Sequence, residues 1–93
     1  MTDERMAEQM KAADTVLRET LTRLIRDDGI APVSVVVVLA TLVGEIAVDN
    51  AATNHGVHDA DSALGPVLRQ VRQAGRTRAE ARRAGRGVPP GHA

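Results

Sequence analysis

A run of nineteen residues, 30–48, is apolar almost throughout and lies near the middle of a chain of only 93 residues. The run is longer than a typical strand, and this length outweighs the strand preference of its four successive valines. The polar residues of this run, together with the residue directly after it, recur at spacings of seven, four and four, which places them along one narrow stripe of a helix. These residues are Ser34, Thr41, Glu45 and Asp49. The pattern predicts a helix over residues 32–52 that is apolar on most of its surface.

The composition limits both the core and the chemistry of this chain. It has no Cys, which excludes disulfides, Cys-ligated zinc, iron–sulfur clusters and thiol nucleophiles. It has no Phe, Trp or Tyr, so it lacks the base-stacking platforms and aromatic cages that those side chains form. An aliphatic core in so short a chain is thin, and oligomerisation is a common way to support one. The Cys-free composition is compatible with the cytoplasm, where we expect the protein to be located.

Two further segments are predicted to be helical. Residues 3–26 carry apolar side chains at spacings of four, three, four, four and three, which is the pattern of one helix face. Gly29 is placed to end this helix. After a polar loop over residues 53–61, Asp61 or Ser62 is expected to cap a short third helix. The apolar face of that helix comprises Leu64, Val67, Leu68 and Val71.

The fold expected from these elements is a small all-α domain of three helices over residues 1–75. The long amphipathic first helix is expected to pack antiparallel to the apolar second helix. Residues 76–93 are rich in Arg, Gly and Pro and are expected to form a disordered tail. The alternative for residues 77–86 is that they continue the third helix as a polar extension.

The apolar second helix allows three interpretations: a membrane span, a helix buried in a monomer, or a helix shared across a homodimer. A span is disfavoured by Glu45 within the apolar window and by the absence of aromatic residues at either end. Burial in a monomer requires more covering surface than the other two helices offer. We therefore predict a homo-oligomer, with a dimer favoured, and self-association through one group of side chains: Val36, Leu39, Val43 and Ile46.

Charge is segregated along the chain although the total is zero. The net charge is −2 over residues 1–28, −4 over residues 29–61 and +6 over residues 62–93. Four arginines of the last segment form a stripe if that segment is helical, namely Arg69, Arg72, Arg76 and Arg83. This stripe is predicted to contact an acidic protein partner. Nucleic-acid phosphates are an alternative, as is a merely solvated face with Glu80 pairing to neighbouring arginines.

Catalytic and metal-binding signals are weak. His55, His58, Asp59 and Asp61 carry ligand chemistry, but their spacing in a loop matches no established metal motif. Neither serine lies in a nucleophile-elbow context. An alternative role for Glu45 is that of a catalytic acid or base, although a residue on a polar stripe more often faces solvent or an interface. We predict no catalytic residue, no metal and no cofactor.

The sequence therefore predicts a non-enzymatic helical interaction module. It is expected to self-associate through its second helix and to present its arginines to an acidic partner. Two alternatives remain, a nucleic-acid-associated accessory protein and a single-span membrane subunit of a larger complex.

Overall fold

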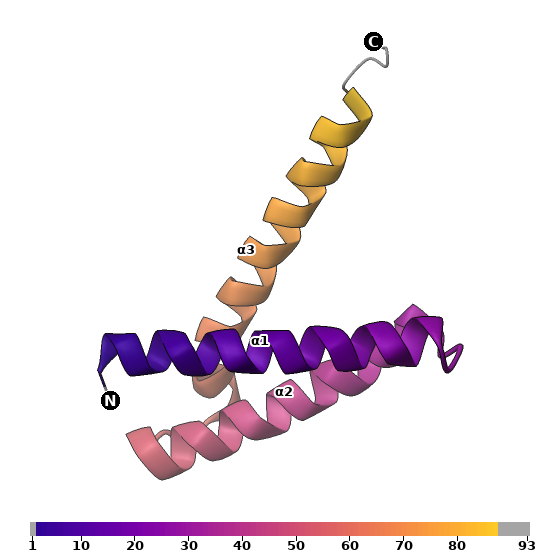
Figure 1. Cartoon of the computed structure of the whole chain (residues 1–93). Coiled ribbons are helices and arrows are strands. Elements are labelled where there is room, and N and C mark those ends of the chain that lie inside the picture. Colours follow the sequence, from indigo (N-terminus) through magenta and orange to yellow (C-terminus); the bar gives the residue numbers. More distant parts are fainter. Residues whose placement is uncertain (1, 88–93) are drawn as a thin grey trace. The chain divides into compact units, whose positions relative to one another are not determined.

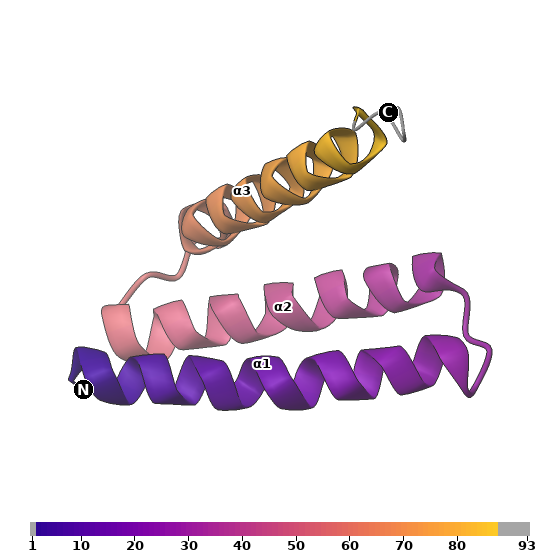
Figure 2. The same ribbon diagram turned by 45° about the horizontal axis from the view of Figure 1, so that its top comes forward.

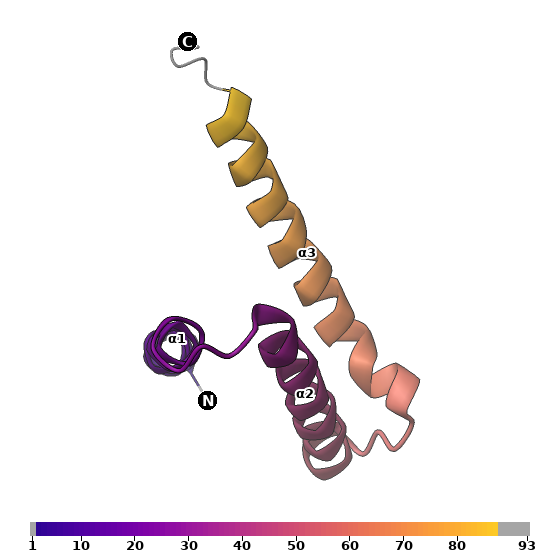
Figure 3. The same cartoon turned by 90° about the vertical axis from the view of Figure 1, so that its right-hand side faces the viewer.

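The computed structural model describes residues 2–87, and every regular element in that range is a helix (Figure 1). The helices are α1 (Asp3–Arg26), α2 (Pro32–His55) and α3 (Ala60–Gly87). The predicted all-α class with three helices is confirmed. The third helix is 28 residues long, so it is not the short element predicted. It continues through Gly75 and includes residues 76–87 (Figure 3), whereas the remainder of the predicted tail, residues 88–93, lies outside the described residues.

The chain divides into two compact units, Met1–Leu42 and Val43–Ala93. The first unit contains α1 and the first part of α2, and the second contains the rest of α2 together with α3. Within the first unit, the beginning of α2 runs back along α1 (Figure 2).

Helix α1 has well-formed ends. The Thr2 hydroxyl accepts a hydrogen bond from the backbone N–H of Arg5 at 3.2 Å, which caps the first turn. Acidic residues occupy the first turn and basic residues the last, and these charges stabilise the helix by interacting favourably with its dipole. On the solvent face, Arg18 Nε donates to both carboxylate oxygens of Asp14, at 2.9 and 3.0 Å. These local interactions support a helix that has no buried residue of its own.

Glycines in the left-handed region end the first two helices. Gly29 has φ 68° in the connection between α1 and α2, and Gly56 has φ 65° directly after α2. Beyond Gly56, the Val57 N–H donates to the Ala51 carbonyl at 3.0 Å, which turns the chain back toward the end of α2. Only glycine adopts this backbone conformation without steric cost.

The N-cap of α3 is Asp59, so the prediction of Asp61 or Ser62 as the cap is wrong. The Asp59 carboxylate accepts hydrogen bonds from the backbone N–H of Ser62 at 2.9 Å and from its hydroxyl at 2.8 Å. These two bonds hold the pKa of Asp59 below its usual value of 3.8. Ser62 therefore acts as the donor to the cap, and the helix begins two residues earlier than Asp61 would allow.

The core within residues 2–87 is very small. Among the described apolar residues, only Val35 and Ala51 are buried, one in each unit. Most of the large aliphatic side chains of α2 are exposed, and its polar stripe covers only a narrow part of the helix surface. The chain therefore forms regular helices while leaving much of its apolar surface uncovered.

Candidate functional site

The apolar side of α2 is the first candidate surface. Three of the four residues predicted for self-association are exposed: Val36 at 61%, Val43 at 41% and Ile46 at 66%. The fourth, Leu39, is half-buried. At 100° per residue the four side chains lie on one side of the helix, and the polar stripe of α2 lies on the opposite side. We refer to these four residues as the α2 face.

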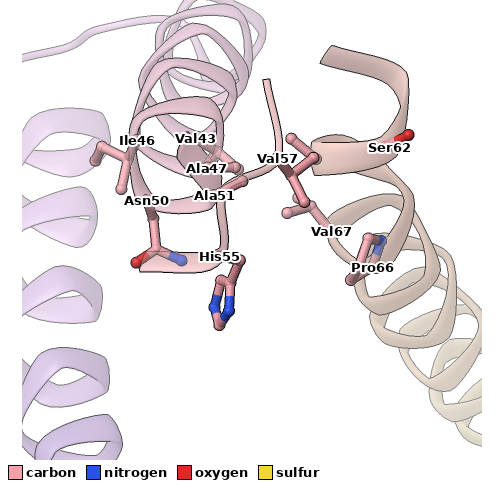
Figure 4. Close-up of a pocket in the computed structure, with 11 residues that line it drawn as sticks. Val43, Ile46, Ala47, Asn50, Ala51, His55, Val57, Ser62, Pro66 and Val67 are labelled. Carbon is pink, nitrogen blue, oxygen red and sulfur yellow. The ribbon is translucent and has the colours of Figure 1, made fainter. Parts of the chain in front are cut away.

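The structure adds an apolar groove that the sequence did not reveal. This groove lies within the second unit and has a volume of about 580 Å³. Figure 4 shows that the end of α2 and the start of α3 supply most of its lining, with Val57 from the loop between them. Val43 and Ile46 of the α2 face both line it. The groove therefore extends the α2 face toward α3.

The lining of the groove is mostly aliphatic. Its apolar members include Ala47, Ala51, Pro66 and Val67, and its polar members are Asn50, His55 and Ser62. The Ser62 hydroxyl is engaged by Asp59. The Asn50 side chain accepts a hydrogen bond from Asn54 at 2.6 Å. The lining is suited to contact with an aliphatic surface, because hydrophobic contact needs apolar area more than directional polar groups.

The arginines of α3 form the second candidate surface. The predicted stripe, Arg69, Arg72, Arg76 and Arg83, is helical and exposed, as is every residue over 68–86. On the helix it lies opposite the apolar residue Val67. The single ion pair found among residues 2–87 joins Asp14 and Arg18 of α1, so no described carboxylate pairs with the stripe.

The residues considered as metal ligands at and after the end of α2 have other roles in the structure. His55 lines the apolar groove, and Asp59 caps α3. Over residues 2–87, no three His, Asp or Glu side chains come together as a metal cluster. Glu45, Asp49 and Asp61 are all exposed. The candidate site of this protein is thus an apolar surface with charged neighbours.

No known protein family, characterised protein or solved structure matches this chain.

Proposed function

We propose that this protein is a non-enzymatic helical interaction module that self-associates through the α2 face and presents the arginines of α3 to an acidic partner. The observation that carries the proposal is the exposure of Val36, Val43 and Ile46 on one side of a regular helix. Apolar side chains of this size gain free energy when they leave water, and a partner surface is the means of burying them.

The groove supports the same proposal. Val43 and Ile46 contribute to both the α2 face and the groove, so a partner seated on the α2 face also contacts the start of α3. The apolar area offered is larger than that of α2 alone. A two-fold dimer uses this area twice, because the same patch is presented by both copies.

A second candidate function is a membrane span, and one specific observation favours it. Among the described residues, α2 is long and apolar enough to cross a bilayer, with a mean hydropathy of 1.9 over its most apolar window. The charge pattern argues for the interaction module instead. Glu45 lies within the apolar run, and a charged side chain inside a bilayer is costly unless it is paired.

Light scattering on the purified full-length chain tests the proposal. A dimer gives twice the mass of one chain, and a lower protein concentration shifts it toward the monomer. A monodisperse monomer at high concentration contradicts self-association. Fractionation of cells expressing the chain, without detergent, tests the second candidate: recovery entirely in the membrane pellet supports the span and contradicts the module.

A further inference from the structure

The arginines of α3 gather on one half of that helix. All of them lie between residues 69 and 86, where every side chain is exposed. At about 100° per residue they fall within one half of the helix circumference. The other half carries no cation over this range, and it holds Glu80, the one acidic residue there. The arginines in question are Arg69, Arg72, Arg76, Arg78, Arg82, Arg83 and Arg86.

Within the basic half, arginines form two rows with small residues between them. The two rows are separated by about 120° around the helix. Gly75 and Ala79 lie between them, on a line that we call the central strip. A Cβ added at Gly75 would meet no atom within 4 Å, so the central strip is open at that position. The first row comprises Arg72, Arg76 and Arg83, and the second comprises Arg78 and Arg82.

Two rows of cations beside an open strip fit a groove better than a flat surface. The major groove of B-form DNA is about 12 Å wide and admits an α-helix. A phosphate backbone borders the groove on each side, so a helix seated in it can direct one row to each backbone. Small residues on the central strip allow the helix to approach the base edges. A flat anionic surface, such as a layer of lipid headgroups, meets one side of a helix and leaves one row unused.

The composition and the helical form of the basic segment separate duplex DNA from other nucleic acids. Proteins that bind single strands commonly stack the bases on aromatic side chains, and this chain has no Phe, Trp or Tyr. Duplex RNA has a deep and narrow major groove that side chains cannot read. The wide major groove of B-form DNA therefore suits this helix best.

We infer that the acidic partner of the α3 arginines is double-stranded DNA, with residues 69–86 in the major groove and the two rows on its two phosphate backbones. The inference rests on the part of the proposed function that gives these arginines an acidic partner. It does not require self-association, because the α2 face is a different surface. Binding is expected to depend little on base sequence, since contacts to phosphates carry no sequence information.

The first test measures binding of the full-length chain to a fluorescently labelled DNA duplex of mixed sequence, by fluorescence anisotropy. Five or six neutralised phosphates predict that the affinity falls about thirtyfold for each doubling of salt. An RNA duplex of the same sequence is expected to bind at least about tenfold more weakly, because its major groove excludes the helix. Equal affinity for the two duplexes would contradict a seat in the major groove.

The second test removes two arginines from one row at a time. R76A/R83A and R78A/R82A should each weaken DNA binding about tenfold or more and lower the slope of log affinity against log salt by about 2. The matched control is R5A/R23A, which makes the same charge change at two exposed residues of α1. Its salt slope should match that of the wild type. Circular dichroism checks that each variant keeps its helix content.

The third test fills the central strip and keeps every arginine. G75L/A79L places two large side chains between the rows, and leucine is a strong helix former. DNA binding should weaken about tenfold, because the helix is held away from the floor of the groove. Binding to poly-glutamate, which has no groove, should be unchanged. If G75L/A79L binds DNA as tightly as the wild type, the helix does not enter the groove and the inference is wrong.

The remaining outcomes separate this inference from the proposed self-association. A dimer that fails to bind the DNA duplex at about 0.05 M salt overturns the inference and leaves self-association intact. A monomer that binds DNA as described supports the inference and contradicts self-association. A loss confined to one of the two row variants, or an equal loss in R5A/R23A, overturns the inference. So does tighter binding to poly-glutamate, or to vesicles of phosphatidylserine and phosphatidylcholine in equal amounts, than to the DNA duplex.

Discussion

The carboxylate of Asp59 accepts two hydrogen bonds from Ser62, one from its backbone N–H at 2.9 Å and one from its hydroxyl at 2.8 Å. This pair begins α3 immediately after the loop that follows Gly56. Pro66 and Val67, about one turn further along α3, line the groove.

Acidification is expected to weaken the start of α3 by protonating Asp59. The two hydrogen bonds lower the pKa of Asp59 in the folded chain below its usual value of 3.8. A lowered pKa means that the stabilisation is present above pH 3.8 and is lost as the pH falls through the folded-state pKa. Helix content measured by circular dichroism between pH 5 and pH 2 should fall in D59N less steeply than in the wild type, since an amide cap does not titrate. An identical acid transition in both proteins would contradict this role for Asp59.

Two glycines are expected to respond to alanine in opposite directions. Gly75 lies inside α3 with no atom within 4 Å of an added Cβ, so G75A should stabilise the helix by about 1 kcal/mol through backbone preference. Gly56 has φ 65°, and G56A should destabilise the chain by about 1 to 2 kcal/mol because alanine is strained there. Urea denaturation at one fixed protein concentration compares the two. A G56A variant as stable as the wild type would show that the turn after α2 does not need glycine.

The helices were predictable to the extent that they depend on local pattern. The first helix was predicted over residues 3–26, and the structure confirms those bounds, because its apolar spacing and Gly29 are both local signals. The second was predicted to end at residue 52 and ends at His55, three residues nearer to Gly56. The N-cap of α3 was misplaced because several polar residues in the loop are good caps, and only the folded turn decides which one is used.

The groove was not predictable from the sequence. Its lining comes from two helices separated by the turn at Gly56, and no repeating pattern in the sequence predicts the angle between helices that such a turn produces. The one available signal was Val57, an apolar residue among polar neighbours directly after the glycine. The continuation of α3 past Gly75 was left open for a similar reason: a single glycine lowers helix preference, but the surrounding Ala, Arg and Glu residues favour it.

Valines of α2 are expected to differ sharply in their importance for stability. Val35 is buried at 9% exposure, so V35A should lower the free energy of unfolding by about 1.5 kcal/mol through the loss of two buried carbons. Val37 is 60% exposed, and V37A should change stability by less than about 0.5 kcal/mol, since alanine also favours the helix. Thermal denaturation at equal concentration measures both. Equal effects of the two substitutions would contradict the small core centred on Val35.

Self-association is expected to depend on one side of α2. V36D/V43D places two carboxylates on the α2 face, where both side chains are exposed in the single chain. The fold of each chain should therefore persist, whereas burying those charges in an apolar contact is costly, and the dimer should weaken about a hundredfold or more. S34D/T41D adds the same charge to the polar stripe on the opposite side of the helix and serves as the matched control. Sedimentation velocity of the three proteins at one concentration provides the comparison. If both double variants dissociate equally, net charge rather than the α2 face controls assembly, because only the α2 face distinguishes them.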